Sequence, residues 1–211
     1  MDRRVSAAVN EEMVGSMIIS THMRMTPSRR ATAADSARAL ALLDQMHRSL
    51  DKYRNVQVAE SDGFTQFLPN VPQPVYHFTN LRWSIAEAFR FDPSHPSSLL
   101  YRKSSHGDFT LIGAMYTARR NAPTDDLDSR IPLGISRWHQ HVNWCVPRKG
   151  DQDRWRETRD GSPLFGPQSR IATREECDRI DGVFHPNVFG WMVHVNAWEG
   201  DDPAVIWGHQ H

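Results

Sequence analysis

The sequence lacks an excess of charge of either sign, and it lacks any long apolar run. Its 211 residues carry 25 basic and 25 acidic side chains. A general nucleic-acid binder would show a clear basic excess, so this balance argues against such a partner. No apolar run approaches the roughly 18–20 residues that a membrane-spanning helix needs. We therefore expect neither a nucleic acid partner nor a membrane span.

Cysteine is scarce, and so are the features of an export signal. Cys145 and Cys177 are the two cysteines. They allow one disulfide, which would suit an extracytoplasmic location, or two half-buried free thiols. A secretory signal needs a basic start, a continuous apolar region and a cleavage site. Met1–Ser20 meets these requirements poorly, because its apolar stretch "MVGSMIIS" is short and follows Glu11 and Glu12. The compartment is therefore not indicated.

Common catalytic motifs are absent as well. The sequence contains no G-x-G-x-x-G, P-loop, H-E-x-x-H, G-x-S-x-G or C-x-x-C pattern, so dinucleotide, nucleotide-phosphate, zincin and serine-hydrolase functions have no support. An acid–base carboxylate beside a metal-bound water is common in metalloenzymes, but Glu87, Glu199 and Asp108 stand at no diagnostic spacing from the histidines. The sequence alone identifies no reaction.

What is present is one long helical pattern followed by several short strands. Residues 1–31 are polar and aperiodic, and we expect a poorly ordered extension before a single domain at residues 32–211. Thr32 and Asp35 have capping-box spacing, and apolar residues then recur on one helical face. The order of elements predicts an α+β fold, with a mostly antiparallel sheet or small curled barrel and the N-terminal helix packed on it.

The remaining elements follow from turn residues and alternation. We expect a hairpin over residues 97–118 with Gly107 in its turn, and strands over residues 137–146 and 188–198. Thr173 and Glu176 form a second capping box that opens a short helix. Residues 119–136 are expected to form a loop with a solvated acidic patch of Asp125, Asp126 and Asp128.

Histidines recur at alternate positions in the stretch "RWHQHVNWC" at residues 137–145. Residues two apart share a face of a strand, so His139 and His141 lie together with Asn143 and Cys145. In the strand "GWMVHVNAW", His194 similarly lies on the less apolar face. If the two strands pair, three imidazoles can converge on one point.

Three imidazoles that converge on one point are typical of a metal-binding site. Imidazole nitrogen binds copper, zinc or iron, and three such ligands leave a coordination position for water or O₂. We therefore predict one transition metal ion, of a kind that the sequence does not distinguish, bound by His139, His141 and His194, with His77 in "VYHFTN" as fourth ligand. A three-histidine site with an open position would suit an enzyme, whereas a fourth histidine would suit a carrier.

Several neighbours are assigned supporting roles on the same reasoning. Asn143 and Asn196 are expected to orient the imidazoles or a bound water. Met192 offers a soft axial group, and with Cys145 it would make a copper-type site, although a disulfide between Cys145 and Cys177 is the simpler arrangement. Trp198 shares the expected face of His194 and is either a pocket wall or core filling.

The metal site has two alternatives. With 11 histidines in the chain, chance gives on the order of half an H-x-H pair, and a second pair, His209 and His211, ends the sequence. In the first alternative, the histidines are hydrogen-bonded core residues of an interaction module. In the second, they line a pocket for a small non-metal ligand together with asparagine and aromatic side chains. A small molecule or a metal ion is thus the expected partner, and nothing indicates the oligomeric state.

The blocks "WHQHVN" and "GWMVHV", with "LLYR", "LIGAMYT" and "EEC", resemble a group of small uncharacterised bacterial proteins that has no assigned activity. The resemblance covers roughly residues 39–208, and the two histidine blocks are its most specific parts. Many members of that group begin with an export signal, which this chain matches poorly. Cupins also begin their first motif with H-x-H, but the glutamate that follows it in cupins is missing here.

Overall fold

The structure is a computed structural model that describes residues 21–69 and 73–208. The described chain forms two compact units. The first comprises residues 21–27 and 139–190, and the second comprises residues 28–69, 73–138 and 191–208. Of the expected N-terminal extension, residues 1–20 lie outside the described residues, whereas Met23–Met25 forms strand β1 of the first unit.

The second unit is built on an antiparallel sheet with the strand order β10-β5-β4-β3-β2. Its strands are β2 (Thr65–Gln66), β3 (Tyr76–Thr79), β4 (Ser98–Lys103), β5 (Phe109–Ala118) and β10 (Trp191–Val195). The hairpin of β4 and β5 turns at Gly107, which has a φ of 96°, so the predicted hairpin is confirmed. Glycine adopts this left-handed conformation at no steric cost.

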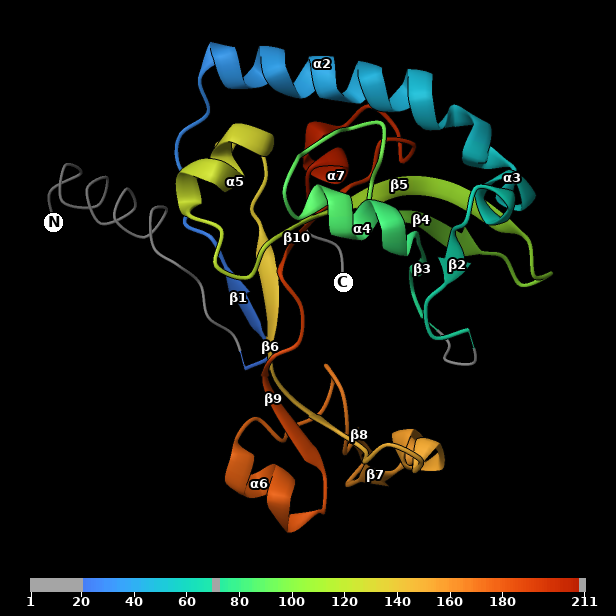
Figure 1. Cartoon of the computed structure of the whole chain (residues 1–211), viewed down its shortest axis with the longest axis vertical. Coiled ribbons are helices and arrows are strands. Elements are labelled where there is room, and N and C mark those ends of the chain that lie inside the picture. The colour runs from blue at the N-terminus through green and yellow to red at the C-terminus, as the bar shows by residue number, and fades with distance from the viewer. Residues whose placement is uncertain (1–20, 70–72, 209–211) are drawn as a thin grey trace, which may run out of the picture. The chain divides into compact units, whose positions relative to one another are not determined.

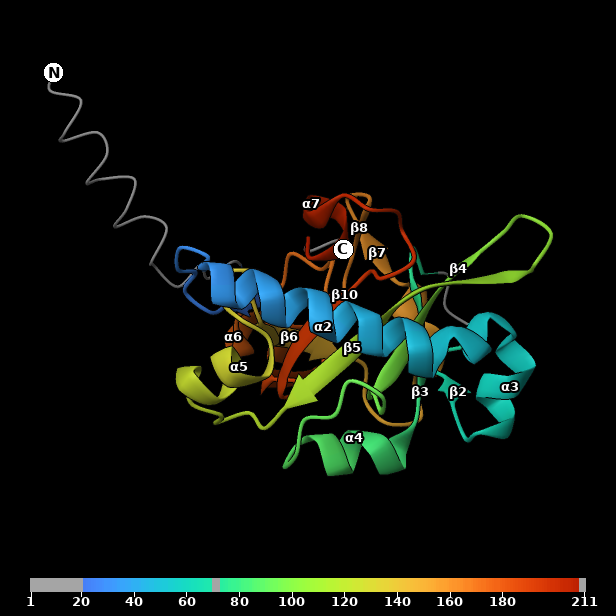
Figure 2. The same ribbon diagram turned by 90° about the horizontal axis from the view of Figure 1, so that it is seen from above.

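Helix α2 (Ala33–Leu50) covers one face of this sheet (Figures 1 and 2). Thr32 and Asp35 form the predicted capping box at its start. The helix buries Leu42, Met46 and Leu50 in one continuous core with Tyr101, Tyr116, Val193 and other side chains of the sheet. This packing leaves the opposite face of the sheet, which carries His77 and His194, turned away from α2.

Short helices complete the second unit. They are η1 (Asp51–Arg54), α3 (Val56–Ser61), α4 (Leu81–Glu87), α5 (Thr124–Arg130) and α7 (Pro203–Ile206). Helix α5 lies where a loop was expected, and that expectation is wrong because Asp125 and Asp126 favour the first turn of a helix. The expected acidic patch is also wrong in part: Asp128 binds Arg29 and the backbone of Leu133, and Asp126 pairs with the buried Arg130.

The first unit is a three-stranded antiparallel sheet with β6 (His139–Val146) at its centre. Strand β1 pairs with residues 139–141, and β9 (Val183–Asn187) pairs with residues 142–146. Three further elements belong to this unit. They are the hairpin of β7 (Thr158–Arg159) and β8 (Ser162–Pro163), the 3-10 turn η2 (Gln152–Arg156) and helix α6 (Arg174–Arg179). Helix α6 opens with the predicted capping box of Thr173 and Glu176.

The predicted strand at residues 188–198 is shortened to Trp191–Val195, and a separate strand that was not predicted, β9, precedes it. Residues 183–187 pair with β6, whereas Trp191–Val195 pairs with β5, and the chain bends between them near Gly190. Two consecutive strands therefore pair with different partner strands, which periodicity along the sequence does not reveal. The α+β class, the antiparallel pairing and the long helix packed on the sheet are confirmed. No helix in the described part of the chain is long and apolar enough to cross a bilayer.

Candidate functional site

The second unit brings His77 of β3 and His194 of β10 together. Their Nε2 atoms lie 3.5 Å apart, and their ring centroids lie 5.3 Å apart with the planes inclined by 53°. His194 is buried, with 6% of its surface exposed, and His77 is half-buried. Two predicted ligands that are far apart in the sequence therefore meet at their nitrogen tips.

This meeting depends on the shape of the sheet. Strands β3 and β10 are separated by β4 and β5, so in a flat sheet their backbones would lie about 14 Å apart. A register shift between Leu100 and Tyr101 bends the β4–β5 ladder, and Figure 1 shows both strands curving. Gly113 of β5 allows close approach, because a Cβ atom there would lie 2.3 Å from the carbonyl oxygen of Val195.

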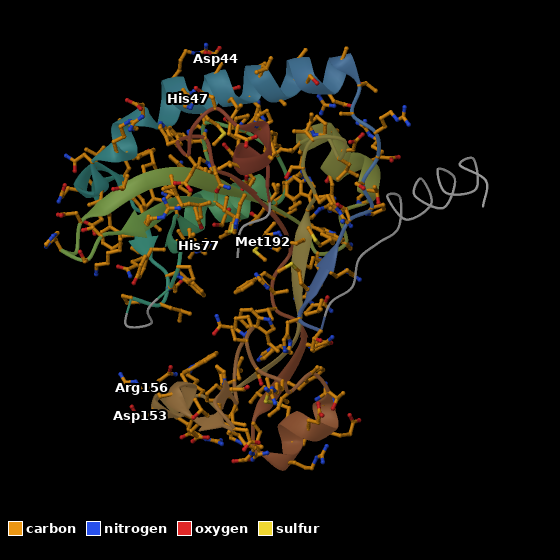
Figure 3. The ribbon with its side chains drawn as sticks, turned by 180° about the vertical axis from the view of Figure 1, so that it is seen from behind. Asp44, His47, His77, Asp153, Arg156 and Met192 are labelled. Carbon is orange, nitrogen blue, oxygen red and sulfur yellow. A yellow bond between two sulfur atoms is a disulfide. The ribbon has the colours of Figure 1, made fainter. Side chains whose placement is uncertain are left out.

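The face around the two histidines carries small hydroxyls and two thioethers. Met115 is the direct partner of His194 across the β5–β10 ladder, and directly opposed Cβ atoms lie about 4.5–5.5 Å apart. Met192 lies two residues before His194 on the same face. Figure 3 shows Met192 and His77 on the side of the sheet away from α2. Thr79 and Ser98 share a hydrogen bond of 2.8 Å on this face.

The other two predicted ligands belong to the first unit. His139 is fully buried and His141 half-buried, and their ring centroids lie 5.3 Å apart on β6. The ring of His141 also packs against Trp144 at 5.0 Å. The two histidines are thus neighbours on one face, as alternation predicts. Convergence of this pair with His77 and His194 on one ion stays a prediction.

The residues predicted to support the site make other contacts. Asn143 has a φ of 58°, and its amide donates to the carbonyl of Thr21. Asn196 donates to the carbonyl of Val205 and so holds α7 against β10. Both amides therefore fix the backbone, and neither donates to a histidine in the described structure.

Trp198 lies beyond the end of β10, so strand alternation does not place it with His194. Its indole N–H donates to Asp51 at 3.3 Å, and its ring meets the edge of His47 at 5.3 Å. Trp198 is thus packed against the core beneath α2, which is the core-filling alternative of the sequence analysis.

Cys145 and Cys177 form a disulfide in the first unit. Together with Phe165 they make its small buried core. A sulfur in a disulfide is not a thiolate, so Cys145 is not a metal ligand in this state.

Within residues 21–69 and 73–208, no three His, Cys, Asp or Glu side chains are grouped so as to hold a metal ion. His209 and His211 lie outside the described residues. The described structure therefore offers histidine pairs, one in each unit, as the starting point for any metal site.

Glu87 is a buried carboxyl that the sequence pattern did not single out. Its Oε2 accepts hydrogen bonds from the backbones of Ser97 and Thr117 and from the Thr117 hydroxyl, at 2.9–3.1 Å. Burial nevertheless raises the pKa of Glu87 from 4.5 to about 8. A carboxyl with such a pKa is mostly protonated at pH 7. No sequence signal identifies it, because the burial arises from the packing of α4 on β4 and β5.

Comparisons with family models, with curated proteins and with solved structures found no match for this chain.

Proposed function

We propose that the protein binds one transition metal ion through histidine, with His77 and His194 as two of the ligands. The observation that carries the proposal is the distance of 3.5 Å between their Nε2 atoms. An ion 2.0–2.1 Å from each nitrogen would subtend an angle of about 117°, near the tetrahedral value. As a hydrogen bond the contact is long, since N–H···O bonds in proteins normally span about 2.7–3.2 Å.

The nature of the neighbouring side chains favours copper. Thioethers are soft ligands that bind Cu(I), whereas zinc sites in proteins use nitrogen, thiolate and carboxylate donors. Met115 opposes His194 in register and Met192 shares its face, so both thioether residues lie on the face of the histidine pair. The sequence prediction adds His139 and His141 of the first unit to the ligand set. An ion with an open position would bind water or O₂, and an ion closed by four histidines would be carried or sensed.

Elemental analysis of untagged protein tests the proposal. The chain is stripped with a chelator, re-exposed to copper, zinc and iron in turn, and freed of unbound metal. We expect one equivalent of metal per chain, with copper retained best, and loss of that equivalent in His77→Ala and in His194→Ala. Removal of His209 and His211 serves as the matched control and should change nothing.

Parallel measurements on His139→Ala and His141→Ala establish whether the pair in the first unit serves the same ion. A drop from one equivalent to none in all four variants supports a single site. Metal content at background in the intact protein would contradict the proposal and would favour a small-ligand pocket instead.

A further inference from the structure

Helix α4 and the loop after it enclose a pocket in the second unit. The pocket has a volume of about 460 Å³ and is lined by Arg82, Trp83, Ala86, Glu87, Arg90, Asp92 and His95. Arg82 and Ala86 lie four residues apart on α4, and Arg90 follows in the turn where its backbone N–H donates to the Ala86 carbonyl at 3.0 Å, so the three lie in one row. His95 also lines the pocket, and its ring packs in a T-shaped contact with Trp83 with the centroids 4.5 Å apart.

The pocket holds more hydrogen-bond donors than acceptors. The guanidinium groups of Arg82 and Arg90 and the indole N–H of Trp83 make no hydrogen bond or ion pair with any described residue. The acceptors are already in use: the Asp92 carboxylate binds the Ser94 backbone and His95 Nδ1, each at 2.9 Å. Such a surplus of donors fits a ligand that is rich in acceptors and negatively charged.

Glu87 lines the same pocket from beneath and adds no competing acceptor. Only 2% of its surface is exposed, and its Oε1 has no hydrogen-bond partner in the described structure. Because the carboxyl is mostly protonated at pH 7, the two arginines are not neutralised from below. Two guanidinium groups thus face one ionised carboxylate, Asp92, and the pocket keeps a net positive charge.

An apolar stripe runs beside the arginine row on α4 and the turn that follows it. Leu81, Ile85 and Phe89 are large apolar side chains with 73%, 59% and 73% of their surfaces exposed. Ile85 is three residues from Arg82 and Phe89 is three residues from Ala86, so the stripe borders the row directly. It extends about 12 Å along the helix direction. Arg119 lies 5.9 Å from the Phe89 ring and adds a third cation at its end.

We propose that this surface is a binding site for a soluble amphiphilic oxyanion. Its phosphate or carboxylate group would lie between Arg82, Arg90 and Trp83, and its alkyl chain would lie along Leu81, Ile85 and Phe89. Only a ligand with both parts uses the whole surface. A free inorganic anion would leave the apolar stripe exposed, and a neutral alkyl ligand would leave the hydrogen-bond donors unused. The site is separate from the histidine pair and does not depend on a bound metal.

Calorimetric titration of the full chain with inorganic phosphate and with hexyl phosphate tests the proposal. Hexyl phosphate should bind at least tenfold more tightly than inorganic phosphate. Arg82→Gln and Arg90→Gln should each weaken both ligands by about tenfold or more, since charged hydrogen bonds are lost. Phe89→Ser should weaken hexyl phosphate and leave inorganic phosphate unchanged.

Two exposed side chains elsewhere provide controls of the same chemistry. Leu40→Ser removes an isolated leucine on α2 that is 68% exposed, and Arg170→Gln removes an exposed arginine of the first unit. Neither should alter binding. Equal affinities for the two phosphates, or arginine variants that bind as the wild type does, would overturn the proposal.

An anionic lipid bilayer also presents phosphate groups together with alkyl chains. Binding to lipid vesicles distinguishes such a surface from a soluble ligand. Sedimentation with phosphatidylglycerol vesicles, compared with phosphatidylcholine vesicles, measures attachment to an anionic surface. Attachment to anionic vesicles by a protein that does not bind hexyl phosphate would also overturn the proposal. Binding of hexyl phosphate without sedimentation supports it.

Discussion

The Nε2 atoms of His77 and His194 lie 3.5 Å apart although 117 positions separate the residues in the sequence. They are carried by strands that are not adjacent in the sheet, so their meeting results from the curvature of β4 and β5. This spacing is the basis of the proposed metal site, because one ion at the usual bond length could reach both nitrogens.

Bound metal should stabilise the second unit, because an ion that binds the folded state alone shifts the folding equilibrium. At a free metal concentration of 100 times Kd, the gain is about 2.7 kcal/mol. Thermal unfolding with and without copper should show this rise in the wild type and none in His194→Ala. His106→Ala changes an exposed turn histidine and should retain the full metal-induced rise. An equal rise in His194→Ala would contradict the proposed ligand.

Gly113→Ala should both destabilise the fold and impair metal binding. The added Cβ would lie 2.3 Å from the carbonyl oxygen of Val195 and 2.9 Å from Cα of Asn196, so β5 and β10 must separate. We expect a loss of about 1–3 kcal/mol, the usual cost of overpacking, in urea unfolding. Thr110→Ala, at an exposed position of the same strand, is the control. A Gly113→Ala protein with unchanged stability and metal affinity would show that the close approach is not required.

Local patterns predicted the secondary structure where a single element determines it. The capping boxes at Thr32 and Thr173 and the turn at Gly107 are formed by residues within a few positions of each other. Alternation also places His139 beside His141 on β6. The pairing of β9 and β10 with different partner strands was not predictable, because it depends on which distant strand each segment pairs with.

The candidate sites, too, could be predicted from the sequence only where the residues of one element determine them. His77 and His194 could be selected as histidines in short strands, but only the strand order shows that they meet. Asn143, Asn196 and Trp198 share a nominal face with the histidines in an ideal strand. A left-handed residue at Asn143 and the end of β10 at Val195 remove that regularity. The buried environment of Glu87 likewise arises from tertiary packing, which no spacing in the sequence encodes.

Glu87 should make the protein less stable as the pH rises. Its pKa in the folded state is about 8, against an ordinary value of 4.5, so between these values the folded state binds more protons than the unfolded state. The contribution of Glu87 to stability is therefore complete below pH 4.5 and is lost as the pH rises to about 8. A shift of this size corresponds to a few kcal/mol.

Glu87→Gln should remove this dependence because the amide is neutral at every pH. Urea unfolding of both proteins from pH 5 to pH 9 measures the effect, and the variant should gain stability relative to the wild type as the pH rises. A constant difference between the two proteins across that range would show that Glu87 is ionised normally in the folded state.

Reduction of the disulfide should destabilise the first unit. Cys145 and Cys177 are 32 residues apart, and closing a loop of this size contributes roughly 2–4 kcal/mol. Urea unfolding with and without a reductant measures the loss. The double variant Cys145→Ala/Cys177→Ala should resemble the reduced protein and should no longer respond to the reductant. A wild type that is equally stable in both conditions would contradict this prediction.

Gly182→Ala examines the packing around the same disulfide. A Cβ atom at Gly182 would lie 2.4 Å from Sγ of Cys145 and 2.7 Å from Sγ of Cys177, so the bridge must move or fail to form. We expect slower or incomplete oxidation, measured by thiol titration after refolding. Complete oxidation at the wild-type rate would indicate that the space beside the bridge is larger than the structure shows.

X-ray absorption at the metal edge of the loaded, untagged protein tests the central claim most directly. We expect at least two imidazole ligands at about 2.0 Å from the metal, and one imidazole fewer in each of His77→Ala and His194→Ala. A spectrum without imidazole scattering, or one that is unchanged in both variants, would contradict it.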